Sequence, residues 1–66
     1  MKYPDKNSVW RHRNGIKYVV IELANTDSSN YKYVPTVVYK NIKTFSVWSR
    51  PVEDWHRSFT RVYPDE

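Results

Sequence analysis

The chain has 66 residues, with eleven Lys and Arg against seven Asp and Glu, and no cysteine. A chain of this length forms one domain with a small core. The absence of cysteine excludes a disulfide framework and a cysteine-based zinc site. Eleven aromatic residues (three Trp, six Tyr and two Phe) are therefore expected to fill the core, because each buried ring removes about 150–250 Å² of surface from water.

The net charge is +4. A basic domain of this size tends to bind polyanions, although the same charge also keeps a small protein soluble. No stretch of about 18 apolar residues is present to span a membrane, and the first residues lack the apolar segment of a signal peptide. We therefore expect a cytoplasmic protein that has no membrane partner.

Residues 1–7 are expected to form a flexible lead-in, because Pro4 and Asn7 disfavour regular structure. Residues 8–13 alternate as a first strand, with Trp10 and His12 on one side. Asn14-Gly15 predicts a hairpin with a type I′ turn. Residues 17–23 form the second strand, which is β-branched and aromatic. In this strand the alternation predicts that the core face consists of Val19, Ile21 and Leu23, with Tyr18 and Val20 on the other face.

Residues 24–33 are rich in Asn, Asp, Ser and Thr, which predicts a loop. The third strand is expected over residues 36–40 and the fourth over residues 45–50. Alternation places Phe45 and Val47 on one face of the fourth strand, and Ser46, Trp48 and Arg50 on the other. Loops with the composition of residues 24–33 are usually variable surface connections, but they also carry binding residues in many proteins.

Pro51 suits the first position of a helix, and Glu53 and Asp54 suit a helix N-terminus. We expect one short helical turn here, followed by a fifth strand over residues 59–63 and a C-terminal tail over residues 64–66. The fold class is therefore all-β: residues 8–63 form a small five-stranded SH3-like barrel with one helical turn before the last strand. An open sheet covered by the helical turn is the alternative. The expected core is Val37, Tyr39, Val47, Trp55 and Phe59.

The chain also resembles a known family over residues 9–62. The residues that carry the resemblance are Trp10-Arg11-His12, Asn14-Gly15, Tyr18, Val37-Val38-Tyr39 and Val47-Trp48-Ser49-Arg50-Pro51, with Trp55 and Phe59. Their order is similar to that of the DUF1653 family, which comprises short, uncharacterised bacterial and tailed-phage proteins. The chain departs from the common pattern at residues 31–35 and at Trp55-His56. The resemblance implies a compact β fold and no established activity, and a phage-encoded member would act in the cytoplasm of the host cell.

Catalytic or metal-binding groups are sparse in this sequence. The chain has two histidines, His12 and His56, no cysteine and no glycine-rich phosphate loop. Asp54 and His56 are two residues apart in a turn, which is not a metal-ligand spacing. The sequence therefore predicts no enzyme, no metal site and no cofactor.

Cations interleaved with aromatic side chains are the pattern that binds phosphates and bases. The candidate binding residues are Arg11, Arg13, Trp48, Arg50, His56 and Arg57. They would form one patch if the first strand, the fourth strand and the helical turn lie side by side. The tryptophans and Arg50 also have structural interpretations: the tryptophans as core, and Arg50 as a residue that stacks on a ring or binds the carbonyls of a turn.

The sequence therefore favours a non-enzymatic binding module with an anionic partner. A host protein surface is the first hypothesis, in the manner of a phage accessory protein, and a nucleic acid or a nucleotide is the alternative. The oligomeric state is open, and a homodimer is compatible with a small domain that has exposed strand edges.

Overall fold

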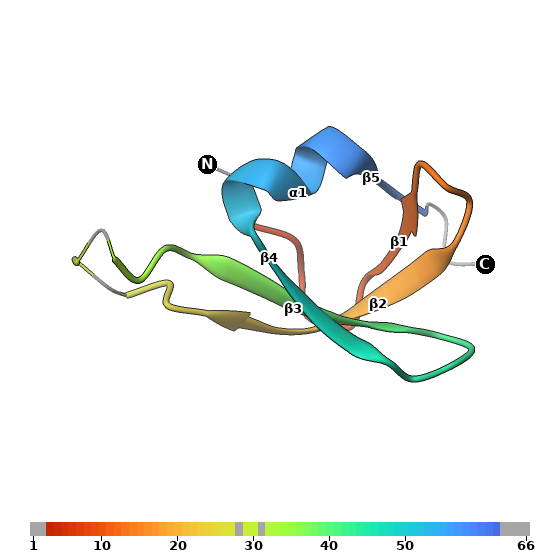
Figure 1. Cartoon of the computed structure of the whole chain (residues 1–66), viewed down its shortest axis with the longest axis horizontal. Coiled ribbons are helices and arrows are strands. Elements are labelled where there is room, and N and C mark those ends of the chain that lie inside the picture. Colours follow the sequence, from red (N-terminus) through yellow and green to blue (C-terminus); the bar gives the residue numbers. More distant parts are fainter. Residues whose placement is uncertain (1–2, 28, 31, 63–66) are drawn as a thin grey trace.

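The computed structural model describes residues 3–27, 29–30 and 32–62. Five antiparallel strands form one sheet in the order β4-β3-β2-β1-β5, and a short helix between β4 and β5 covers one face of it (Figure 1). The elements are β1 (Val9–His12), β2 (Lys17–Ala24), β3 (Thr36–Asn41), β4 (Val47–Pro51), α1 (Val52–Ser58) and β5 (Phe59–Arg61). The chain is mostly β, as predicted. Within the described residues the sheet does not close into a barrel, and β4 and β5 are its two edges.

The hairpin between β1 and β2 forms where Asn14-Gly15 predicted it, but its turn is of another type. The Gly15 N–H donates to the His12 carbonyl oxygen (2.8 Å), and the His12 N–H donates to the Ile16 carbonyl oxygen (2.9 Å). Only Gly15 has positive φ in this turn (+90°), whereas a type I′ turn also needs it at Asn14. Residues 13–15 are therefore a β-turn followed by a left-handed glycine, which is the three-residue type of hairpin loop. The Asn14 Oδ1 accepts from the Ile16 N–H (2.9 Å) and holds this geometry.

Of the predicted core face of β2, Leu23 is confirmed, but the faces predicted for Val20 and Tyr18 were wrong. Val20 is fully buried and Tyr18 packs against the core, although the simple alternation placed both on the opposite face. The pairing of β2 with β3 shifts register between Val20 and Glu22. This β-bulge adds one residue to β2, so Leu23 packs against the same core as Val20 in spite of their odd spacing.

The start of the fourth strand was also predicted wrongly. β4 begins at Val47, and Phe45 has a left-handed backbone (φ +63°) in the connection before it. Trp48 lies opposite Tyr39 and Arg50 opposite Val37, so these two side chains take the side of the sheet that bears the core. Val47 therefore lies on the outer side, where it is 60% exposed and contributes nothing to the predicted core.

Helix α1 has seven residues, more than the single turn that was predicted. Pro51 is the last residue of β4 and occupies the N-cap, with ψ at 141°, instead of the first helical position. Glu53 and Asp54 lie in the first turn as expected, where negative side chains favour the helix dipole. β5 ends at Arg61, and the predicted end of the strand at Tyr63 and the tail over residues 64–66 lie outside the described residues.

The core is a web of aromatic rings between α1 and the sheet. The rings of Trp55 and Phe59 stack with centroids 3.8 Å apart, and Trp10 and Tyr39 meet Trp55 edge-on at 5.6 and 5.0 Å. Burial of Tyr39, Trp55 and Phe59, together with Val37, confirms four of the five predicted core residues. Rings that supply this much apolar area explain how a short chain folds without a disulfide.

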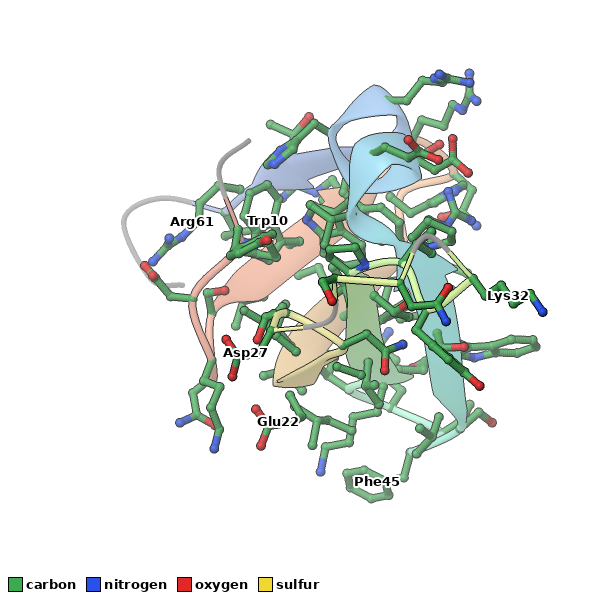
Figure 2. All side chains as sticks on the ribbon, turned by 90° about the vertical axis from the view of Figure 1, so that its left-hand side faces the viewer. Trp10, Glu22, Asp27, Lys32, Phe45 and Arg61 are labelled. Carbon is green, nitrogen blue, oxygen red and sulfur yellow. The ribbon has the colours of Figure 1, made fainter. Side chains whose placement is uncertain are left out.

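The described residues before β1 contact the sheet. Pro4 is buried, and the Asn7 N–H donates to the Val20 carbonyl oxygen (2.8 Å). The Asp5 carboxylate lies 3.2 Å from the guanidinium of Arg61, which in turn lies over Trp10 (Figure 2). These contacts fix the chain entry beside β5. The division into a lead-in, a domain and a tail stays a prediction.

Candidate functional site

The two hairpins of the sheet meet at one end of the molecule. Tyr18 of β2 lies opposite Asn41 of β3, and beyond this pair the Ile42 N–H donates to the Lys17 carbonyl oxygen (3.4 Å). The tips of the β1–β2 and β3–β4 hairpins therefore lie at the same end of the sheet, while the described residues of the connection between β2 and β3 lie at the opposite end (Figure 1). We call these the hairpin end and the loop end.

The hairpin end is basic. Its cations are Arg11, Arg13, Lys17, Lys40 and Lys43. Arg11 lies directly opposite Lys17 in the β1–β2 pair, an arrangement of like charges that opposes folding and that a bound anion would relieve. The sequence has no Asp or Glu in residues 6–21 or 28–52, so neither hairpin tip contributes a negative charge.

Three of the described acidic side chains form ion pairs elsewhere. Asp5 pairs with Arg61 (3.2 Å), Glu22 with Lys6 (3.3 Å) and Asp54 with Arg57 (3.6 Å). The pKa of Glu22 is lowered, first by the Leu23 N–H, which donates to its Oε1 (3.0 Å), and then by Lys6. The charge of the described chain is therefore balanced away from the hairpin end and is one-sided at it.

A cleft of about 400 Å³ lies between the two hairpin tips. It is lined by Gly15, Ile16, Lys17, Asn41, Ile42, Lys43 and Thr44. Its shape depends on Asn41, whose Oδ1 accepts from the backbone N–H groups of Lys43 (2.8 Å) and Thr44 (3.1 Å). The lining combines two lysines with two isoleucines that remain 42% and 39% exposed. Its chemistry suits a small molecule that is anionic at one end and apolar at the other.

Two exposed rings flank the hairpin end. Trp48 is 56% exposed at the start of β4, and Phe45 is 66% exposed in the adjacent tip, with the Lys40 Nζ 5.1 Å from its ring centroid. Large rings with exposed faces are the stacking platforms on which unpaired bases bind. The Lys40 ammonium beside the Phe45 ring suits a phosphate of the same strand.

The structure brings some of the predicted binding residues together. The Arg13 N–H donates to the Ser58 carbonyl oxygen (3.0 Å), which places Arg13 beside the end of α1 that carries His56 and Arg57. Arg11 faces the outer side of the sheet, because its neighbour Trp10 is buried on the inner side. The basic side chains at this end thus extend from the outer face of the sheet to the last turn of the helix.

The other predicted residues do not complete a single patch. Arg50 lies on the inner side with its guanidinium 5.2 Å from the Phe59 ring centroid, the stacking arrangement that its structural interpretation describes. The imidazole of His56 packs 5.7 Å from the Trp10 ring, and Arg57 contacts Asp54. Trp48 remains exposed, but it lies on the opposite side of the sheet from Arg11.

Three cations that the sequence analysis passed over belong to the hairpin end: Lys17, Lys40 and Lys43. The signal that could have found them is the distribution of acids. Two long segments of the sequence without Asp or Glu contain two neighbouring hairpins, and antiparallel pairing brings both tips to one end.

The two histidines pack against aromatic rings of the core. The His12 Nδ1 accepts from the Asn14 N–H (3.1 Å), and its ring packs edge-on against Phe59 at 4.9 Å. No group of three His, Asp or Glu side chains in the described part of the chain lies close enough to hold a metal ion. No helix within that part is long and apolar enough to cross a membrane.

No protein-family model, curated protein or solved structure matches this chain.

Proposed function

We propose that this protein is a non-enzymatic binding module for single-stranded nucleic acid. The observation that carries the proposal is the basic hairpin end, which has five cations and no described acid, together with the exposed rings of Phe45 and Trp48 in the β3–β4 hairpin. Phosphates supply the negative charge that this surface lacks, and they provide most of the affinity in sequence-independent binding.

A single strand suits the surface better than a duplex does. The faces of stacked bases are covered in a duplex, so exposed protein rings gain little from it, whereas unpaired bases stack on such rings. Trp48 and Phe45 come from one hairpin, Trp48 from β4 and Phe45 from the tip before it, and both keep more than half of their surface exposed for such stacking.

The test is fluorescence anisotropy with a labelled single strand of about 12 nucleotides, a length in the range that small β domains cover. If about four phosphates contact the hairpin end, the logarithm of the association constant falls with the logarithm of the salt concentration with a slope of about −3. A duplex of the same sequence is the control and should bind more weakly. Absence of binding at low salt would overturn the proposal.

An acidic host-protein surface is the second candidate partner. The edge of β4 favours it, because the strand pairs only with β3 and exposes Val47 and Trp48. An acidic segment could add to such an edge as a further strand. Pro51 has no N–H and therefore shortens the edge that is available for pairing. For this reason we rank the protein partner second to nucleic acid. A pull-down from host lysate would support it if it yields one acidic protein that stays bound after nuclease treatment. A variant with an altered β4 edge should fail to retain that protein.

We further propose that the fold is related to the SH3-like barrels. The strand order, in which β1 pairs with both β2 and β5, and the helix between β4 and β5 support this relationship. Membership of the DUF1653 family, a phage origin and a place in the host cytoplasm are proposals of the same kind, and they rest on the sequence resemblance. An experimental structure in which the two edge strands, β4 and β5, lie far apart would argue against the barrel.

A further inference from the structure

The cleft between the hairpin tips has the properties of a site for one nucleotide. We propose that it binds a single unstacked nucleotide of the bound strand, with the phosphate at Lys17 and Lys43 and the base between Ile16 and Ile42. The inference rests on the proposed function, since it assigns a specific subsite to that binding surface. Its volume of about 400 Å³ lies within the range of small-molecule sites.

The phosphate end is defined by charge. Lys17 is the first residue of β2 and Lys43 lies in the β3–β4 tip, so the two lysines line the cleft from different hairpins. The backbone contact between Ile42 and Lys17 (3.4 Å) fixes the spacing of these hairpins. Neither hairpin tip contains an acid. Two cations in this arrangement therefore suit a phosphate better than an uncharged apolar ligand.

The base end is defined by the isoleucines. Ile16 and Ile42 line the same cleft and keep about two fifths of their surface exposed in a protein whose other aliphatic side chains are mostly covered. A flat ring inserted between two aliphatic side chains would remove apolar surface on both of its faces from water. The isoleucines thus offer the cleft an apolar slot next to its charged end.

Asn41 supplies a polar group that distinguishes a base from a simple apolar ring. Its Oδ1 is held by the N–H groups of Lys43 and Thr44. The side-chain amide is therefore fixed in orientation, and its Nδ2 is the end that donates. A donor at the rim of the cleft can bind the acceptor atoms on a base edge, so we expect unequal affinities for different bases.

The experiment is a titration of the intact protein with nucleoside monophosphates, monitored by the backbone amide signals of Gly15 and Lys43 and the side-chain amide of Asn41. Gly15 is the only glycine in the chain, which makes its signal easy to assign. Inorganic phosphate and the uncharged nucleoside are titrated separately. We expect the monophosphate to shift all three signals at concentrations about tenfold below those that either fragment needs.

Two variants separate the base end from general charge. Ile42→Ser should weaken monophosphate binding about fivefold, because apolar contact on one face of the base is lost. Asn41→Asp keeps the acceptor that holds the tip but replaces the donating Nδ2, and should weaken binding further. Asn30→Asp is its matched control, since Asn30 Oδ1 accepts from the Lys32 N–H (2.9 Å) in a similar turn at the loop end. It makes the same change of charge and should leave the titration unchanged.

The outcomes distinguish the two proposals. If the labelled strand binds but the monophosphates shift none of the three signals, the nucleotide subsite is wrong and the proposed function stands. If the strand does not bind while the monophosphates do, the subsite stands and the protein binds free nucleotides instead. If Asn30→Asp weakens the titration as much as Asn41→Asp, or if phosphate alone binds as well as the monophosphate, the base slot is overturned.

Discussion

The two ends of the sheet are built from similar side chains and differ in how charge is arranged. Each end has an asparagine whose Oδ1 holds a turn, Asn41 at the hairpin end and Asn30 at the loop end. Each also exposes a ring, Trp48 (56%) and Tyr33 (58%), and a lysine, Lys43 and Lys32. The types of residue therefore do not distinguish a binding end from a surface connection.

Arrangement does distinguish the two ends. The loop end carries Asp27 in the same connection as Lys32 (Figure 2), and it is formed by one connection of the chain. The hairpin end joins two tips that contain no acid, and a cleft lies between them. A protein of this size thus gains a candidate site by bringing two segments of one charge sign together, and equal substitutions at the two ends test the idea.

Removal of both cleft lysines should have the largest effect. Lys17→Gln with Lys43→Gln should lower the affinity for a single strand about a hundredfold, because two charge-assisted phosphate contacts are lost. The slope of the salt dependence should fall in magnitude by about 1.4, at roughly 0.7 per phosphate. Anisotropy titrations at several salt concentrations measure both quantities.

Lys32→Gln is the matched control for that pair. It removes a lysine from the loop end and should change the affinity by less than about twofold, since a distant exposed charge is largely screened at physiological salt. Equal losses from Lys32→Gln and from Lys43→Gln alone would show that only net charge matters, and would contradict a localised basic end.

Removal of the exposed ring at the hairpin end should have the next largest effect. Trp48→Ala should weaken strand binding about tenfold, because stacking of a base on an aromatic ring contributes about 1–3 kcal/mol. The salt slope should stay unchanged, as no phosphate contact is lost. The unfolding midpoint should change little, because more than half of the Trp48 surface is already in contact with solvent.

Tyr33→Ala removes a similarly exposed ring from the loop end, and we expect it to leave strand affinity unchanged. The intrinsic fluorescence of Trp48 offers a second readout, since Trp10 and Trp55 are buried and respond less to a ligand. Strand binding that quenches no tryptophan fluorescence and survives Trp48→Ala would exclude Trp48 from the surface.

The sequence predicted the order of the elements well, because turn residues and β-branched segments are local signals. Asn14-Gly15 located the first hairpin, and Glu53 and Asp54 marked the first turn of the helix. The faces of the strands were harder. One bulge after Val20 reverses the parity of β2, and the longer tip with Phe45 at positive φ moves Val47 to the outer side. Neither feature has a glycine or a proline that would indicate it in the sequence.

The candidate site was predicted only in part, for a different reason. Arg11 and Arg13 were found because they stand beside aromatic residues, whereas Lys17, Lys40 and Lys43 are unremarkable in the sequence. Their proximity depends on the register of β2 with β3, which pairs Tyr18 with Asn41. Arg50 is the opposite case. Its sequence context suggested binding, whereas in the structure its guanidinium lies over the ring of the core residue Phe59.

The smallest expected effect concerns the ion pairs that balance charge away from the hairpin end. The folded-state pKa of Glu22 is lowered by the Leu23 N–H and by Lys6. A carboxyl with a lowered pKa stabilises the fold above its unfolded-state pKa, and this stabilisation is lost as the pH falls through the folded-state pKa. Glu22→Gln should therefore be slightly less stable than the parent protein at neutral pH.

The difference between these two proteins should disappear in acid, below the folded-state pKa of Glu22, where both side chains are neutral. Urea unfolding at several pH values measures it, and because the Glu22 side chain is 55% exposed we expect a difference near the limit of detection. Strand affinity should be unaffected at every pH, since Glu22 lies on β2 beyond the bulge from the hairpin end. A gain in affinity on Glu22→Gln would mean that the anion reaches past Val20, and that the basic surface extends along the sheet instead of ending at the two tips.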